Sequence, residues 1–137
     1  ARGLPRQPED LVKHDCIAFS KSGDPVPWPF RSPGQAQRVL TITPRLSVNT
    51  ADAAAAAAIA GGGITWLYSY QAAPHLAAGS LTAVLAKFEA DPIPVSIVYP
   101  AGRLVPQKVR HFIDFAAERL RSALHEIDFR CTIAPVS

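Results

Sequence analysis

Short runs in which apolar and polar residues alternate recur along this chain, and such alternation is typical of strands with one buried face. The runs extend over Asp15 to Ser20, Arg38 to Thr43, Arg45 to Val48, Ile64 to Tyr68, Leu81 to Leu85 and Pro94 to Tyr99. The run from Ile64 to Tyr68 is apolar and rich in β-forming residues, so we expect it in the centre of the sheet. The stretch 21–29 predicts a loop, although Trp28 and Phe30 alternate around Pro29 and favour an edge strand or extended segment there.

Helical periodicity is clearest toward the C-terminus. Apolar residues at three- and four-residue steps predict an amphipathic helix from Pro106 to about Leu124, with a stripe of Val109, Phe112, Ile113, Ala116 and Leu120. No pattern is clear from His125 onward. A short helix is also predicted from Pro8 to Lys13, and one or two helical turns between Tyr70 and Gly79, interrupted by Pro74.

Between two of the predicted strands lies an alanine-rich helix with defined ends. Asn49 or Thr50 is its N-cap, and Asp52 falls in the first turn, where the helix dipole favours an acidic residue. The helix is expected from about Ala51 to Ala60, and the glycines 61–63 end it. These glycines do not form a phosphate loop, because they follow a helix instead of opening one. Strands and helices in this order predict an α/β fold in which helices flank a mixed sheet.

The composition is that of a folded domain. Of 137 residues, 48% are hydrophobic and 18% are charged, and the formal net charge is +3. The basic residues are scattered, so we expect no DNA-binding stripe within this chain. No run of about 18 apolar residues is present, so we expect no membrane span. The lack of methionine leads us to expect a piece of a longer protein. Two distant cysteines, Cys16 and Cys131, make no disulfide framework and favour the cytoplasm.

The start of the alanine-rich helix is the strongest candidate for a binding site. Asn49 and Thr50 follow a strand, and the first N–H groups of a helix bind anionic or polar groups of small ligands in α/β proteins. Ordinary N-capping accounts for the same two residues. On the next strand, Tyr68 can stack on a ligand or pack under the helical turns that follow it. Thr65 and Trp66 alternate between faces, so that either can reach a ligand or belong to the core.

Catalytic and metal-binding functions find little support in the sequence. His14, Asp15 and Cys16 combine three catalytic residue types, but adjacent residues of a strand point to opposite faces and cannot simply converge. The other histidines have no metal-ligand spacing with one another or with a cysteine pair. A third hypothesis, a hydrolase fragment, lacks the Gly-x-Ser-x-Gly nucleophile elbow. We therefore expect no catalytic residue, no metal and no cofactor.

Four phrases of the sequence occur in a distinctive order. They are Pro8-Glu-Asp-Leu with His14-Asp-Cys-Ile, Leu46-Ser-Val-Asn with the alanine-rich helix and Gly63-Ile64, Ala73 to Leu81 with Val84-Leu85, and Pro94 with Tyr99-Pro100 and Lys108 to Phe115. In this order, and with these gaps, they resemble the distal half of the inducer-binding domain of LysR-type transcriptional regulators, over about Leu4 to Leu124. Members of that family usually have proline where Tyr68 stands, so a tyrosine there would change which ligand fits.

The resemblance implies a periplasmic-binding-protein-like (type II) fold of two α/β lobes, with a small-molecule effector in the cleft between them. Residues 1–94 would form the second lobe, residues 95–124 the hinge strand and a helix returning to the first lobe, and residues 125–137 a C-terminal tail. The two-lobe domain would be incomplete, because the opening strands of the first lobe are absent. On this basis Asn49, Thr50, Thr65 and Tyr68 are the predicted ligand-binding residues.

The function implied is an effector-sensing module of a bacterial regulator, in which ligand binding favours one lobe arrangement and thereby alters DNA binding. DNA would be contacted only by a winged helix-turn-helix that is absent from this chain. A homo-oligomer is expected, because the apolar stripe of the last helix would otherwise be exposed. The alternative is a lobe of an extracytoplasmic solute-binding protein, which shares the two-lobe architecture; cleavage of a leader would then account for the missing methionine.

Overall fold

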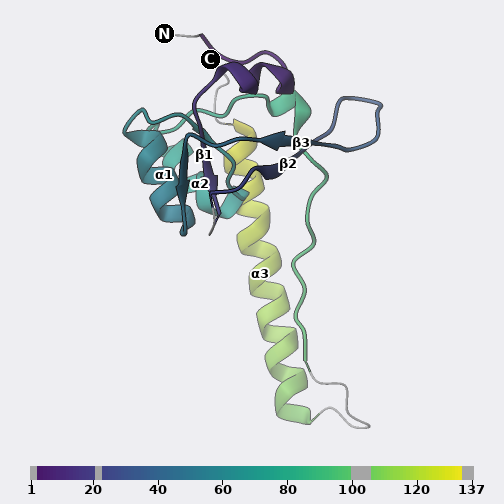
Figure 1. Ribbon diagram of the computed structural model, residues 1–137. Helices are drawn as coiled ribbons and strands as arrows, with labels where there is room; N and C mark the ends of the chain where they lie inside the picture. The colour runs from purple at the N-terminus through teal and green to yellow at the C-terminus, as the bar shows by residue number, and fades with distance from the viewer. Residues whose placement is uncertain (1–2, 21–22, 100–105, 134–137) are drawn as a thin grey trace.

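The computed structural model describes residues 3–20, 23–99 and 106–133, with side chains as far as Ile127. Figure 1 shows a small α/β body from which one long helix extends. The predicted α/β fold class is confirmed. The described chain opens with a 3-10 helix, η1 (Pro8–Lys13), whose first residue is the expected proline.

A parallel sheet of three strands forms the body. Its order is β4 (Leu46–Val48), β1 (Cys16–Phe19) and β5 (Ile64–Thr65). Ile17 in the middle of β1 pairs with Leu46 on one side and with Thr65 on the other. The predicted strands at Asp15 to Ser20 and Arg45 to Val48 are therefore confirmed.

The central strand is β1, not the apolar run that begins at Ile64. Cys16, Ile17 and Ala18 are all at most 1% exposed, as expected for a parallel strand covered on both faces. The prediction that Ile64 to Tyr68 would be central was wrong, because only Ile64 and Thr65 join the ladder and they do so at its edge. An apolar run indicates that its residues are buried, but it does not indicate that they pair with another strand. Here Ile64 and Trp66 both pack against the core, and Trp66 lies outside the ladder.

A separate antiparallel pair, β2 (Val26–Phe30) and β3 (Arg38–Ile42), packs beside the parallel sheet. The predicted strand at Arg38 and the edge strand around Pro29 are confirmed, and the predicted loop gives way to β2 from Val26 onward. Two prolines are tolerated in β2 because each strand of a two-stranded sheet has a free edge. Parallel and antiparallel pairing are thus both present, but in two sheets joined by one core of Leu11, Cys16, Trp28, Phe30 and Ile42.

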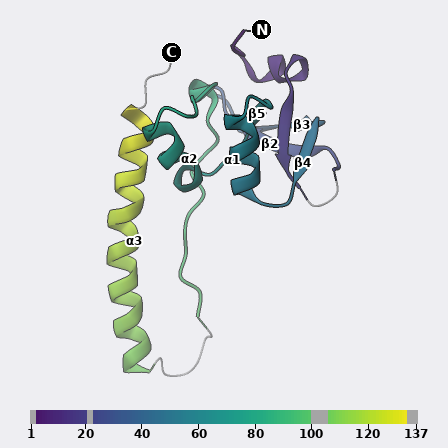
Figure 2. The ribbon, with the colours of Figure 1, turned by 90° about the vertical axis from the view of Figure 1, so that its left-hand side faces the viewer.

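The alanine-rich helix α1 (Ala51–Ile59) lies on the parallel sheet and contacts β1 (Figure 2). Ala54 and Ala55 are 0% and 3% exposed, and their small side chains allow the helix to approach the sheet closely. The glycines end α1 as predicted. Gly61 has φ +80°, its N–H donates to Ala58 O at 2.9 Å, and the next N–H donates to the carbonyl of residue 57 at 2.9 Å. This is the Schellman arrangement, which satisfies carbonyls that the helix leaves free.

The predicted turns around Pro74 form one continuous helix, α2 (Ser69–Ala77). Pro74 lies inside it and removes a single backbone donor, which does not end the helix. The strand predicted at Leu81 to Leu85 is absent: residues 82–85 have no ladder partner, and Leu85 has a left-handed backbone, φ +60°. A 3-10 turn, η2 (Ala86–Phe88), follows, and its Phe88 carbonyl accepts a hydrogen bond from the Arg31 N–H at 3.0 Å.

The run Pro94 to Tyr99 is also not a strand, because none of its residues pairs with another strand in the described chain. It belongs to a segment that leaves the body in the same direction as the last helix, α3 (Gln107–Ile133) (Figures 1 and 2). α3 continues past Leu124, where the predicted helix ended, and packs against α2. Within the described residues, no helix combines the length and apolarity needed to cross a membrane.

Candidate functional site

The parallel sheet places the ends of β1 and β4 side by side. Phe19 pairs with Val48, and the Ser20 N–H continues the ladder by donating to the Val48 carbonyl at 2.9 Å. Because parallel strands end at the same edge, Asn49 and Thr50 follow β4 at the carboxyl edge of the sheet. That edge is where open α/β sheets bind ligands.

Thr50 is the N-cap of α1, as predicted. Its backbone is extended, with φ −134° and ψ 148°, and its Oγ1 accepts a hydrogen bond from the Ala53 N–H at 3.2 Å. Both Asn49 and Thr50 are exposed, so the front of the helix is open to solvent and is not sealed by neighbouring side chains. Asp52 in the first turn is exposed as well, so the helix start carries a negative charge of its own.

Thr65 ends β5 and has a polar atom without a partner. Its Oγ1 is buried and makes no hydrogen bond within the described part of the chain. A buried hydroxyl without a partner costs free energy on folding, so such groups are uncommon in folded proteins.

Three aromatic rings form a row immediately after β5. The rings of Trp66 and Tyr68 meet edge to face with centroids 4.8 Å apart, and Tyr68 stacks on Tyr70 at 5.8 Å with 8° between the planes. Tyr68 is 41% exposed and Tyr70 is 54% exposed. Tyr68 packs on its neighbours, as one of the two hypotheses expected, and its role in ligand binding stays a prediction. Sequence reasoning missed Tyr70, although the spacing of aromatics two residues apart was visible.

The four predicted residues do not form one cluster. Asn49 and Thr50 follow β4, whereas Thr65 and Tyr68 belong to β5 and its continuation. Since β1 lies between those two strands, the strands are about 10 Å apart across the sheet, or two strand spacings. Thr65 pairs with Ile17, which pairs with Leu46, so Thr65 is level with a residue three positions before Asn49 and lies farther than this from it.

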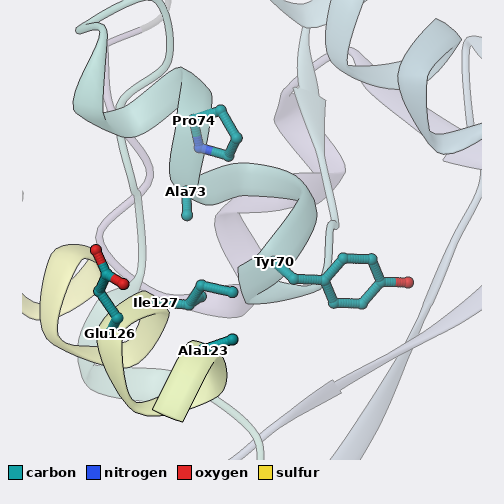
Figure 3. A pocket seen from close by; sticks show the side chains of 6 residues that line it. All are labelled: Tyr70, Ala73, Pro74, Ala123, Glu126 and Ile127. Atoms are coloured by element: carbon teal, nitrogen blue, oxygen red, sulfur yellow. The ribbon is translucent and has the colours of Figure 1, made fainter. Parts of the chain in front are cut away.

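A hollow lies elsewhere, between α2 and α3 (Figure 3). It has a volume of about 390 Å³ and is lined by Tyr70, Ala73, Pro74, Ala123, Glu126 and Ile127. None of the four predicted ligand-binding residues lines it. Tyr70 connects the hollow to the aromatic row, because it stacks on Tyr68.

The residues His14, Asp15 and Cys16 do not form a catalytic group. Burial raises the pKa of the Cys16 thiol, and the neighbouring Asp15 charge raises it further, so the thiolate is disfavoured. The Cys16 Sγ instead lies 3.7 Å from the carbonyl oxygens of Leu11 and His14, and Asp15 pairs with Arg45 at 3.0 Å. Cys16 is a small buried core residue, as its apolar context predicted. Cys131 lies outside the described side chains.

Comparison with known proteins identifies the chain. A family model, the LysR substrate binding domain, matches residues 1–121. The chain belongs to this family. The regulatory domain of AphB from Vibrio vulnificus, in a structure treated with cumene hydroperoxide, is similar, with a TM-score of 0.68 and 25% identity over 84% of this chain and 56% of that one.

Named relatives of this LysR substrate-binding domain are transcriptional regulators. An uncharacterised HTH-type regulator of Escherichia coli, YcaN, is 29% identical over 114 residues, which are 82% of this chain and 36% of that protein. The HTH-type regulator CrgA of Neisseria meningitidis is 27% identical over 89% of this chain and 40% of that protein. This domain therefore spans a little over a third of those regulators. The relatives do not favour the solute-binding alternative.

A shorter relative is also known. YagP of Escherichia coli, which is named for its LysR-family substrate-binding domain, is 30% identical over 107 residues. These are 77% of this chain and 78% of YagP, so the two chains are of similar length.

Proposed function

We propose that this domain senses a small-molecule effector for a bacterial LysR-type transcriptional regulator, and that the effector binds across the carboxyl edge of the parallel sheet. The observation that carries the proposal is the exposed N-terminus of α1, capped by Thr50, at the edge where β1 and β4 end. The other three residues assigned to the site are Asn49, Thr65 and Tyr68.

Each residue has a distinct part in the proposed site. The amides at the start of α1 attract an anionic or polar group, because the helix dipole and the free N–H groups both favour it. Asn49 offers a side-chain amide beside them. Thr65 Oγ1 gains the hydrogen bond that it lacks, and the exposed ring of Tyr68 offers a stacking surface. Asp52 repels a negative charge, so the site favours effectors with a single carboxylate over those with several.

In this proposal, effector binding changes the arrangement of the two lobes, and that change alters DNA binding by the regulator. An effector shifts the equilibrium between arrangements only by as much as it binds one better than the other. DNA is contacted by a winged helix-turn-helix in the rest of the regulator, and the regulator acts in the cytoplasm as a homo-oligomer. The proposed domain needs neither a metal nor a cofactor for this function.

An NMR titration of the domain with small monocarboxylates, acetate and benzoate, tests the site. We expect the amide signals of Ala51 and Asp52 to shift at millimolar ligand, because these two helix-start donors are not used by the Thr50 cap, whereas the Ala53 N–H donates to Thr50 Oγ1. Asp52→Asn should tighten the binding several-fold, since it removes a like charge. Shifts at Ala51 and Asp52 no larger than those at the start of α2 contradict the proposal.

Variants of Thr50 separate the capping role from the ligand role. Thr50→Ala removes the cap and should lower the free energy of unfolding by about 1 kcal/mol, whereas Thr50→Ser keeps an acceptor in place. In the whole regulator, Asn49→Ala and Tyr68→Ala should raise the effector concentration needed to change operator binding by at least tenfold. Val39→Ala, at an exposed position on β3, is the control. An unchanged response in both site variants removes these residues from sensing.

A further inference from the structure

The chain leaves the body through a short segment that is folded back onto the core. We call residues 85–91 the exit segment. Leu85 and Phe88 pack against the core, and the Phe88 N–H donates to the Leu85 carbonyl at 2.8 Å. The Phe88 carbonyl in turn accepts the Arg31 N–H at 3.0 Å. The body therefore holds the first part of the exit segment through apolar packing and through backbone hydrogen bonds.

The exit segment begins with a strained residue. Leu85 has φ +60°, and among the described residues it is the only non-glycine residue with a positive φ. The left-handed region is unfavourable for such a residue, because its Cβ comes too close to the following carbonyl oxygen. Strain of this kind persists only where surrounding contacts hold it, and it clusters at segments that switch between conformations. The packing of Leu85 and Phe88 against the core supplies those contacts here.

Two side chains hold the far end of the exit segment at Asp91. The Arg31 guanidinium forms an ion pair with the Asp91 carboxylate, and the Asp91 N–H donates to Gln37 Oε1 at 3.1 Å. Arg31 directly follows β2 and Gln37 directly precedes β3, so both lie at the same end of the antiparallel pair. We call Arg31, Gln37 and Asp91 the latch. The side chains of Arg31 and Asp91 are 49% and 54% exposed, so their ion pair adds little stability and opens at small cost.

The chain beyond the latch begins with a stiff sequence. We call residues 92–99 the connector; it runs away from the body in the same direction as α3 (Figures 1 and 2). Pro92 and Pro94 fix their own φ angles, and each restricts the preceding residue to extended conformations. Because the first residues of the connector bend little, a change in the backbone angles at Asp91 would swing the connector as a unit.

We propose that the latch fixes the direction in which the connector leaves the body, and that release of Asp91 is the step that lets the two lobes change their arrangement. The two arrangements themselves belong to the proposed function, on which this step rests. Arg31 and Gln37 are positioning residues, because they act through Asp91 and the connector. A contact made in only one arrangement shifts the equilibrium by its own free energy, so a weak latch suits a domain that a small molecule must switch. The strain at Leu85 favours release of the exit segment, and the latch opposes it.

Arg45 provides a matched control for the ion pair of the latch. Its guanidinium pairs with Asp15 at 3.0 Å, and the two side chains are 72% and 35% exposed. Asp15 precedes β1 and Arg45 precedes β4, so neither residue belongs to the exit segment or the connector. Arg31→Gln and Arg45→Gln therefore remove the same charge and one exposed ion pair each, and they differ in whether the exit segment is released.

Distance measurement by pulsed electron spin resonance on the 137-residue chain tests the latch. In a Cys131→Ser background, spin labels at Ala56→Cys on α1 and at Ser96→Cys in the connector report the direction of the connector. Both positions are exposed, whereas Cys16 is buried and stays unlabelled. We expect one narrow distance distribution in this labelled parent chain.

The variants of the two ion pairs are compared in the same labelled chain. Arg31→Gln should broaden the distribution or add a second component, whereas Arg45→Gln should keep it narrow. The reversed pair, Arg31→Asp with Asp91→Arg, should restore the narrow distribution, because the ion pair forms with its charges exchanged. An unchanged distribution in Arg31→Gln, equal broadening in Arg45→Gln, or a reversed pair that stays broad overturns the proposal.

Operator binding by the whole regulator, measured with no small molecule added, tests the link between the latch and the lobe arrangement. Arg31→Gln should change the dissociation constant about two- to fivefold, which is the effect of losing one exposed ion pair, and the reversed pair should restore it. Arg45→Gln should leave the dissociation constant unchanged. Because no effector is present, a failure of acetate and benzoate to shift the amides at the start of α1 would end the effector-site proposal and leave this result standing. Equal operator affinities of Arg31→Gln and Arg45→Gln overturn the role of the latch in the lobe arrangement.

Discussion

Gly63 faces the backbone carbonyl of Asp15 so closely that a Cβ atom at position 63 would lie 2.1 Å from that oxygen. Gly63 also has φ +141°, a backbone conformation that residues with side chains rarely adopt. The next residue, Ile64, donates its N–H to the same Asp15 oxygen at 2.9 Å. The glycine therefore allows β5 to begin directly beside β1.

We predict that Gly63→Ala destabilises the domain by about 3 kcal/mol or more, because backbone strain and a clash with a carbonyl act together. The matched control is Gly79→Ala: Gly79 also has a positive φ, +68°, but nothing within 4 Å of a built Cβ atom. The control should lose only about 1 kcal/mol. Urea denaturation measures the free energy of unfolding of both variants. Equal decreases in the two variants would show that the close approach to Asp15 contributes nothing to the effect of Gly63→Ala.

The carboxylate of Asp10 gives the domain a measurable acid sensitivity. Hydrogen bonds from the backbone N–H groups of Arg6 at 3.0 Å and Gln7 at 3.2 Å lower the pKa of Asp10. A hydrogen bond from Arg38 lowers the pKa of Glu9 in the same way. Since the folded state holds both pKa values below the unfolded ones, the stabilisation is complete above the unfolded pKa and is lost as pH falls through the folded pKa.

Urea midpoints measured between pH 7 and pH 3 test this linkage. The loss of stability toward low pH should be smaller in Asp10→Asn than in the parent chain. Asp24→Asn, which removes an exposed carboxylate before β2, should keep the parent's acid sensitivity. An Asp10→Asn profile that parallels the parent at every pH would contradict the prediction.

Cys16 should resist thiol reagents while the domain is folded. Cys16 is 1% exposed, so reagents reach its thiol poorly. Burial also raises the pKa of the thiol, which disfavours the reactive thiolate form. In a Cys131→Ser background at pH 8, we expect labelling by a disulfide reagent to be slow in buffer and fast in urea above the unfolding transition. Labelling in buffer at the rate of a free thiol would refute the buried position.

Local sequence patterns predicted correctly those elements whose structure depends on neighbouring residues in the chain. The cap at Thr50, the glycines after α1 and the alternation in β1, β3 and β4 each follow from residues within a few positions of one another. The candidate site was predictable to the same extent: the helix start at Asn49 and Thr50 was found, whereas the row that adds Tyr70 to Tyr68 depends on how the chain folds after β5.

The sequence by itself determined the α/β class, the family and the start and end of the alanine-rich helix, because those depend on short-range backbone chemistry and on motifs in order. Only the tertiary structure decided which strand is central, that the runs from Leu81 and from Pro94 have no ladder partner in the described chain, and that α3 meets α2 around a hollow. A strand exists only when another strand lies beside it, and no local pattern specifies that neighbour.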